Sequence, residues 1–143
     1  MQRAQAALAL IALSAGCGEG PVNPAQIAQG AELYAQHCAS CHGARLEGQP
    51  NWRQRLPNGR LPAPPHDESG HTWHHPDSVL FGITKYGLVP LYAPPGYQSD
   101  MPGFGGRLSD EGIRAVLAYI ESHWTATELR AARAQMLRNL KQR

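Results

Sequence analysis

The sequence predicts one small all-α domain that is rich in loops. A length of 143 residues leaves room for a single core. Apolar residues recur at helical spacing in four segments, residues 27–34, 79–83, 113–120 and 129–140. No segment shows the alternation that is typical of a half-buried strand. Ten of the twelve prolines lie between positions 50 and 102, so the middle of the chain is chiefly loop. With 7% aromatic residues, such a chain needs something besides side chains to fill its centre.

The first 23 residues have the composition of an export segment followed by a tether. Residues 1–16 contain one charged residue, Arg3, then an apolar run and small residues, which is the order of a signal peptide. The run is too short to span a bilayer, and the alternative is a buried N-terminal helix. The five residues ending at Cys17 resemble a bacterial lipobox, whose cysteine is acylated, although Ser14 departs from that motif. The alternative at Cys17 is a free thiol near an ordinary cleavage site, and residues 17–23 form the polar tether.

One helix is predicted before the proline-rich stretch, and a second, short helix interrupts it. The first has Asn23 as N-cap and Pro24 at its first helical position, and it runs towards His37. Its apolar face consists of Ile27, Ala31 and Tyr34. The second, shorter helix starts at Pro76 and ends at Gly87, and its apolar stripe consists of Val79, Leu80 and Ile83.

Two further helices are predicted near the C-terminus. Ser109 is the N-cap of the first, which ends near Trp124 and buries Ile113, Val116, Leu117 and Ile120. Thr125 and Glu128 form a capping box for the last helix, which lies within residues 125–143. Its apolar stripe consists of Leu129, Ala132, Met136 and Leu140, and it is basic through Arg130, Arg133, Arg138 and Lys141.

The chemical signature of the chain follows directly after the first helix. Cys38 and Cys41 are separated by two residues and followed by His42, which is the c-type haem attachment pattern. Two thiols at this spacing reach two neighbouring vinyl groups of a porphyrin and form thioethers. The histidine is then held over the iron as its proximal ligand. The motif therefore predicts one covalently bound haem c.

Two other interpretations of the cysteine pair are weaker. A redox dithiol of the thioredoxin type needs a βαβ setting, which the sequence lacks. A zinc site needs two more ligands at compatible spacing, and the chain has no second cysteine pair.

A set of residues spread along the chain carries a family resemblance. In chain order these are Gly30, Tyr34, the attachment motif, Gly43, Gly48, Pro50, Met101, Pro102, residues 108–111, Val116 and Tyr119. Over about residues 24–124 the chain thereby resembles the class I, or mitochondrial-type, cytochromes c. It is also similar to a bacterial subgroup with a Leu-Pro-x-Gly-Arg-Leu-Pro stretch, here residues 56–62, before a His-rich turn. The insert before Pro76 is longer than in the smallest members.

The resemblance implies a cytochrome c fold, with three to five helices around one low-spin haem that has His and Met axial ligands. It makes Met101 the distal ligand. The other methionines are Met1, in the export segment, and Met136, in the last helix. The alternative for Met101 is a gap-filling core residue.

The resemblance also implies two contacts that hold the site together. The carbonyl of Pro50 would accept a hydrogen bond from His42, with Pro57 as a rival for that place. Gly30 and Tyr34 of the first helix would cross Val116 and Tyr119 of the third, because the glycine lets the two helices touch.

One loop holds a group of aromatic and imidazole side chains, His66, His71, Trp73, His74 and His75. We expect this loop to cover the haem edge, with Trp73, Arg60 or His71 donating hydrogen bonds to the propionates. Two alternatives stay open: a copper or zinc site in the loop, and a histidine that replaces Met101 on the iron.

The expected function is transfer of single electrons rather than enzymatic catalysis, because iron with two axial ligands has no open position for a substrate. One alternative is an enzyme, for example a peroxidase-like or nitrite-handling domain, with His71 or His74 as acid–base group. A third possibility is a metal-binding or sensor module that uses the same loop.

The expected partners are redox proteins, on the periplasmic side of a bacterial membrane. The formal net charge of +2 gives no reason to expect nucleic acid. Lipid on Cys17 would anchor the chain. The basic last helix would lie on anionic lipid, bind an acidic redox partner, or pack on its own domain.

Overall fold

The computed structural model describes residues 23–142, and all regular secondary structure in that range is helical. In chain order the elements are α1 (Pro24–His37), α2 (Ala39–His42), the 3₁₀ turn η1 (Thr72–His74), α3 (Asp77–Tyr86), α4 (Asp110–Glu121) and α5 (Thr127–Lys141). No strand occurs between residues 23 and 142, so the predicted all-α class is confirmed. The predicted signal peptide and the acylation site at Cys17 lie outside the described residues.

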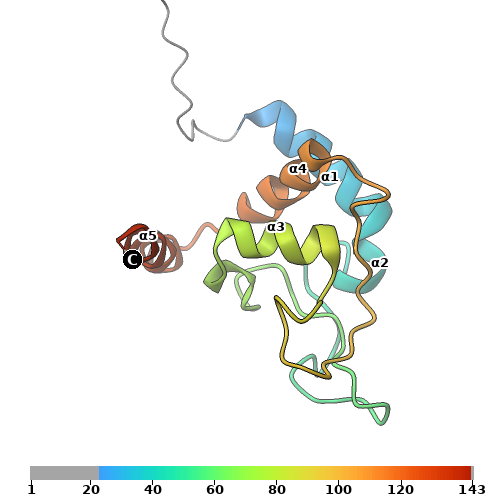
Figure 1. Ribbon diagram of the computed structural model, residues 1–143. Coiled ribbons are helices and arrows are strands. Elements are labelled where there is room, and N and C mark those ends of the chain that lie inside the picture. The colour runs from blue at the N-terminus through green and yellow to red at the C-terminus, as the bar shows by residue number, and fades with distance from the viewer. Residues whose placement is uncertain (1–22, 143) are drawn as a thin grey trace, which may run out of the picture.

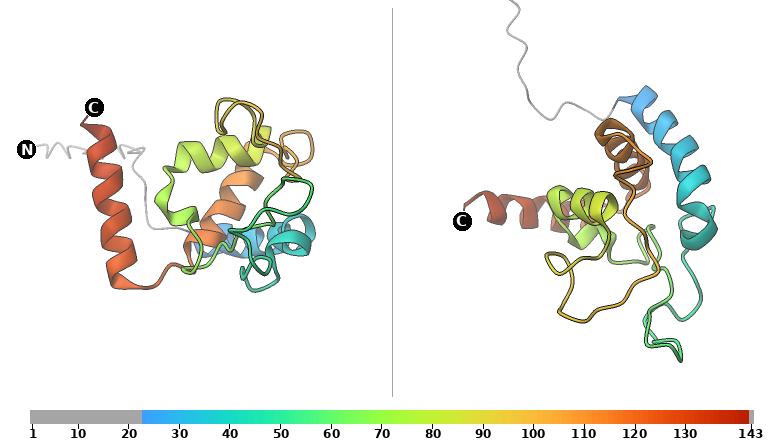
Figure 2. Two further views of the ribbon diagram at one scale, coloured as in Figure 1. Left: turned by 90° about the horizontal axis from the view of Figure 1, so that it is seen from below. Right: turned by 45° about the vertical axis from the view of Figure 1, so that its right-hand side comes forward.

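The centre of the fold is the crossing of α1 and α4, which lie side by side in Figures 1 and 2. Gly30 makes this crossing close, because a Cβ at that position would lie 1.9 Å from the carbonyl oxygen of Ala115 in α4. One turn further along α1, the ring of Tyr34 is buried and its centroid lies 5.4 Å from that of Tyr119. The predicted contact between these two helices is therefore confirmed.

Helix ends in the first four-fifths of the chain follow local side-chain signals. The Asn23 side chain accepts a hydrogen bond from a backbone N–H of the first turn of α1, at 3.0 Å. The Ser109 hydroxyl does the same for α4, at 3.1 Å. Pro76 precedes α3 and Gly87 ends it with a φ of +80°, as predicted. These ends form where short-range rules place them.

The start of α5 is different, because its cap comes from a distant residue. The N-cap is Ala126, which has no side-chain hydrogen bond, so the predicted capping box of Thr125 and Glu128 is wrong. Instead the carboxylate of Glu68 accepts hydrogen bonds from the backbone N–H groups of Thr125 and Ala126, the latter at 2.7 Å. These donors have no partner inside the helix, and Glu68 satisfies them from the loop before η1.

α5 stands apart from the pair α1 and α4 in both views of Figure 2. Its buried residues are Leu129 and Arg133, whereas Ala132 and Leu140 of the predicted apolar stripe are exposed. The helix therefore packs through one leucine and one buried cation rather than through the predicted stripe.

Two long loops lie close to one another below α2 and α3 in Figure 1, and we name them the insert loop (residues 50–62) and the methionine loop (residues 88–102). The base of the insert loop is closed by Gln49 and Ala63: the Gln49 N–H donates to the carbonyl of Ala63 at 2.9 Å, and the Ala63 N–H donates back to the Gln49 side chain at 3.2 Å. An ion pair between Arg60 and Asp100 joins the two loops.

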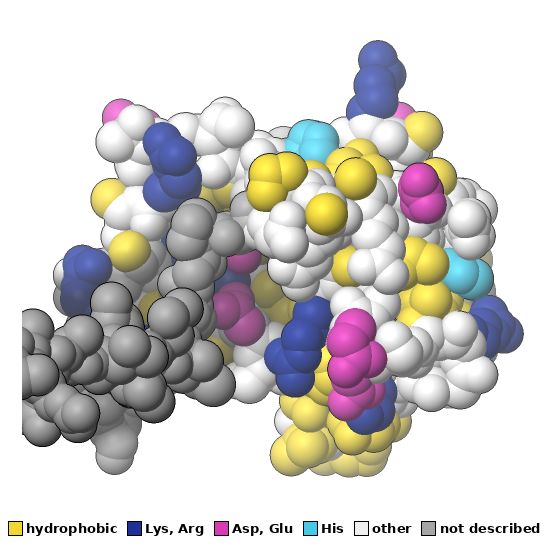
Figure 3. All heavy atoms as spheres, turned by 90° about the horizontal axis from the view of Figure 1, so that it is seen from above, with side chains coloured by type: hydrophobic (Ala, Val, Ile, Leu, Met, Phe, Trp, Pro, Cys, Tyr) yellow, Lys and Arg dark blue, Asp and Glu magenta, His cyan; other side chains and the backbone are white. Residues whose placement is uncertain are grey.

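The surface shows no concentration of one charge on the face drawn in Figure 3. There, Lys and Arg side chains are interspersed with Asp and Glu. This face therefore lacks the single-sign field that attracts nucleic acid. None of the helices between residues 23 and 142 is long and apolar enough to cross a membrane.

Candidate haem-binding site

The two cysteines and the histidine of the attachment motif lie on one helical turn. Cys38 ends α1, and its carbonyl accepts hydrogen bonds from the N–H groups of Cys41 and His42 at 3.1 and 2.9 Å. Cys41 is exposed, whereas Cys38 is half-buried and packs against the main core cluster. Gly43 ends the turn with a φ of +82°. The turn fixes the spacing of two thiols and one imidazole, which attachment at two points requires.

The imidazole of His42 is buried and held by a backbone carbonyl. Its exposed fraction is 7%, and Nδ1 lies 2.8 Å from the carbonyl oxygen of Pro64. Because a carbonyl only accepts, Nδ1 carries the proton and Nε2 is left as the donor atom for a metal. Burial lowers the pKa of His42, which keeps the ring neutral near pH 7.

The predicted hydrogen-bond partners of His42, Pro50 and Pro57, are wrong. Both prolines lie in the insert loop, which leaves and rejoins the domain before the chain reaches Pro64. The residue after the loop therefore takes the place beside the imidazole. Gly48 allows this close approach of the chain, because a Cβ at position 48 would lie 2.4 Å from the backbone nitrogen of Pro65.

The thiol chemistry argues against a redox dithiol. Burial first, and the neighbouring Cys41 second, raise the pKa of the Cys38 thiol to about 11. Dithiols of the thioredoxin type depend on a pKa below the ordinary value for cysteine. The raised pKa of Cys38 therefore gives no support to a redox dithiol.

Met101 lies where the methionine loop returns to the core. Its backbone N–H donates to the Ser99 hydroxyl at 3.1 Å, and its side chain packs against the cluster of Phe104, Leu108 and Ile113. The chain beyond it is attached to α3, because the Phe104 N–H donates to the carbonyl of Thr84 at 2.9 Å. Met101 therefore lies beside α3 and α4, and its role as the distal ligand stays a prediction.

A second imidazole lies directly against that of His42. The His66 ring stacks on it with centroids 4.0 Å apart and planes 26° apart. Its Nδ1 lies 2.9 Å from Oγ1 of the buried Thr72. Burial, and then the neighbouring His42 and His71, lower the pKa of His66 well below its ordinary value, so two neutral rings meet. The sequence placed His66 only within a loop, because spacing does not tell which loop residue turns inward.

The other histidines of the loop pair with aromatic rings. His71 stacks on Trp52 of the insert loop with centroids 5.3 Å apart, and His74 lies edge-on to Trp73. Between residues 23 and 142, no group of three or more His, Cys, Asp or Glu side chains could hold a metal ion. The alternative of a copper or zinc site in this loop therefore has no support in the described part of the chain.

The donors around the site fit a haem c. The indole Nε1 of Trp73 is buried and has no hydrogen-bond partner among the described residues. A buried donor without an acceptor is costly, and a propionate oxygen of a bound haem would supply the missing acceptor. Of the other two predicted donors, Arg60 pairs with Asp100 and His71 stacks on Trp52. Two thiols, a free imidazole nitrogen and this indole N–H are groups that would hold a haem c.

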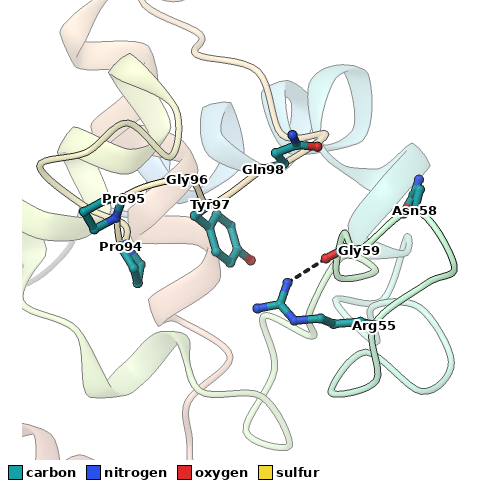
Figure 4. A pocket seen from close by; sticks show the side chains of 8 residues that line it. All are labelled: Arg55, Asn58, Gly59, Pro94, Pro95, Gly96, Tyr97 and Gln98. Carbon is teal, nitrogen blue, oxygen red and sulfur yellow. Dashed lines mark hydrogen bonds between the residues drawn. The ribbon is translucent and has the colours of Figure 1, made fainter.

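A separate pocket of about 420 Å³ lies between the insert loop and the methionine loop (Figure 4). It is lined by Arg55, Asn58 and Gly59 on one side and by residues 94–98 on the other. Arg55 and Tyr97 point toward one another across it, with the guanidinium 5.8 Å from the ring centroid. No cysteine, histidine or methionine lines this pocket, so it is not the site of the iron.

The chain has relatives among known proteins. The family model described as Cytochrome c matches residues 27–124. The chain is also similar to the dihydro-heme d1 dehydrogenase of Pseudomonas aeruginosa, with 32% identity over 132 residues. This match covers 88% of the chain and 22% of the relative, so the chain spans about a fifth of that protein's length. No solved structure matches the chain. The range 27–124 contains the attachment motif and Met101, and it ends before α5.

Proposed function

Because this chain belongs to the cytochrome c family and therefore carries covalent haem c, we propose that it transfers single electrons with His42 and Met101 as axial ligands. One observation carries the proposal: the His42 imidazole, next to the second thiol, is buried with its Nδ1 on Pro64 and its Nε2 free. The bound haem supplies a one-electron iron couple. The protein supplies the ligands, their orientation and the exclusion of water.

The residues of the chain have distinct parts in this proposal. Cys38 and Cys41 hold the porphyrin through thioethers, so it cannot dissociate. Pro64 keeps the proton on Nδ1 of His42 and fixes the position of that nitrogen. A thioether ligand from Met101 favours ferrous iron and raises the reduction potential, whereas a second imidazole would lower it. The indole N–H of Trp73 is the proposed donor to a propionate.

The proposed place of action is the periplasmic side of a bacterial membrane, with lipid on Cys17. Support comes from the order of charged, apolar and small residues in 1–16 and from the lipobox-like residues before Cys17. Redox proteins are the proposed partners. α5 offers exposed cations, Arg130 and Arg138, to anionic lipid or to an acidic partner.

A second candidate function is enzymatic catalysis, and it is favoured by the relative's name, which is that of a dehydrogenase. A catalytic role of this chain would need an open or labile position on the iron and an acid–base group beside it. The sequence-predicted acid–base candidates, His71 and His74, lie in the loop around η1, and His71 is stacked on Trp52. The iron spectrum distinguishes this function from electron transfer.

The test uses protein matured in a bacterial periplasm. The intact mass should show one added haem that survives acid–acetone extraction, and extractable haem would contradict attachment at Cys38 and Cys41. The ferric spectrum should contain the weak band near the red end that marks sulfur ligation. Met101→Ala should abolish this band and lower the potential, whereas the matched control Met136→Ala should change neither. A high-spin wild-type spectrum would favour the enzyme.

A further inference from the structure

We propose that Arg133 of α5 is a positioning residue for the proximal haem ligand: it holds the loop around η1 and thereby keeps His66 stacked against His42. This inference rests on the proposed role of His42 as an iron ligand. α5 lies outside the range matched by the family model, so membership of the family gives this helix no role.

Arg133 is a buried cation, and each nitrogen of its guanidinium has an acceptor. Its exposed fraction is 5%, and its guanidinium lies 4.8 Å from the ring centroid of Trp124. Because a buried guanidinium is costly unless its donors are paired, its partners determine its position. These partners are the carbonyl oxygens of Trp73 and His75, at 2.9 and 2.7 Å, and the carboxylates of Asp77 and Glu121. Arg133 thus joins α5 to the middle residue of η1 and to the residue that follows the turn.

The same loop is attached to α5 at a second point. Glu68 accepts hydrogen bonds from the backbone at the start of α5, at 2.7 Å from the nitrogen of Ala126. The indole Nε1 of Trp124, just before α5, donates to the carbonyl of His66 at 2.9 Å. Residues 66–75 are therefore held by the C-terminal segment at their beginning and at their end.

A continuous series of contacts leads from this attachment to the proximal ligand. Thr72 directly precedes Trp73 in η1, is buried, and has its Oγ1 2.9 Å from Nδ1 of His66. The His66 ring in turn lies against one face of the His42 ring, 4.0 Å between centroids. Pro64 fixes one nitrogen of His42, and His66 blocks rotation of the ring about that hydrogen bond. The plane of the imidazole is thus set from two directions, one of which depends on Arg133.

The orientation of an axial imidazole has its own observables. It determines how the iron d orbitals split, and therefore the spread of g values in the electron paramagnetic resonance of the ferric protein. It also contributes to the reduction potential. A residue that only stabilised the fold would change neither quantity in folded protein.

The decisive variant is Arg133→Lys in the holoprotein. Lysine keeps the charge, but its one nitrogen cannot serve the two carbonyls, Asp77 and Glu121 together, which Arg133 reaches from three separate nitrogens. We expect shifted g values and a shifted midpoint potential, with the sulfur–iron band retained. Arg138→Ala is the matched control, because Arg138 lies on the same helix and bonds Gln135 within it. It should reproduce the wild-type spectrum and potential.

Two further variants make the outcome unambiguous. In a His66→Leu background, Arg133→Lys should no longer shift the g values. Should Arg133→Lys not fold, Thr72→Val decides, because valine keeps the shape of the threonine side chain and removes its hydrogen bond with His66. An Arg133→Lys or Thr72→Val protein that melts lower but has wild-type g values and potential overturns the positioning role alone. A wild-type protein without a low-spin spectrum overturns the proposed ligation, and the positioning role with it.

Discussion

Replacing Gly30 with alanine tests the contact on which the whole fold depends. The added Cβ would lie 1.9 Å from the carbonyl oxygen of Ala115 and 2.8 Å from the Cβ of Tyr119. Neither atom can rotate away, so α1 and α4 must separate. Overpacking of this kind costs about 1–3 kcal/mol, and alanine in a helix returns about 0.5–1 kcal/mol. We take the upper part of the first range and expect a net loss of about 2 kcal/mol, or a melting temperature lower by about 8 °C.

Gly112 in α4 provides a control with the same substitution and the opposite expected sign. A Cβ there would lie 3.4 Å from Cδ1 of Leu33 in α1, which is ordinary contact. Gly112→Ala should therefore keep or slightly raise the melting temperature, because alanine is the better helix residue. Far-ultraviolet circular dichroism of the ferric holoproteins measures both. The steric argument fails if Gly30→Ala melts with the wild type, or if both variants lose the same stability.

Three other predictions follow from separate features. Hydrogen bonds from the backbone of Ala126 and Thr125 lower the pKa of Glu68. Its stabilisation is therefore present above the unfolded pKa and is lost as the pH falls through the folded one. Glu68→Gln should accordingly lower the melting temperature at pH 7, and the difference from the wild type should vanish at strongly acid pH. Labelled fatty acid should enter the wild type but not Cys17→Ser, which should move to the soluble fraction; a native N-terminus at Gly18 or beyond would contradict acylation. His74→Asn with His75→Asn should leave one iron per chain, and copper or zinc in one-to-one ratio with iron in the wild type would show that the loop is a metal site.

The parts of the fold that depend on neighbours in sequence could be predicted. The caps at Asn23 and Ser109, the end of α3 at Gly87 and the attachment turn each involve residues a few positions apart. The crossing at Gly30 was accessible through the family resemblance, since a glycine there permits backbone contact.

The parts that depend on the path of a loop could not be predicted. Pro64 replaces the expected Pro50 because the insert loop closes on itself, and the chain carries no local mark of that closure. Glu68 caps α5 from far away in sequence, where only the capping box was visible. Arg133 looked like one more surface cation, since burial of a guanidinium depends on four partners from three other segments.

Because its base is closed by hydrogen bonds, the insert loop is a suitable place to insert a foreign peptide. Because Gln49 and Ala63 are hydrogen-bonded to each other, an exchange at the tip of the loop that keeps Trp52 and Arg60 should leave unaltered the place where Pro64 meets His42. Lengthening a flexible loop costs little, about 0.6 kcal/mol for each doubling. The tip around Asn58 can therefore be exchanged for a surface-binding peptide while Arg60 keeps its ion pair. Such a peptide would attach the haem protein to an electrode surface from one chosen side.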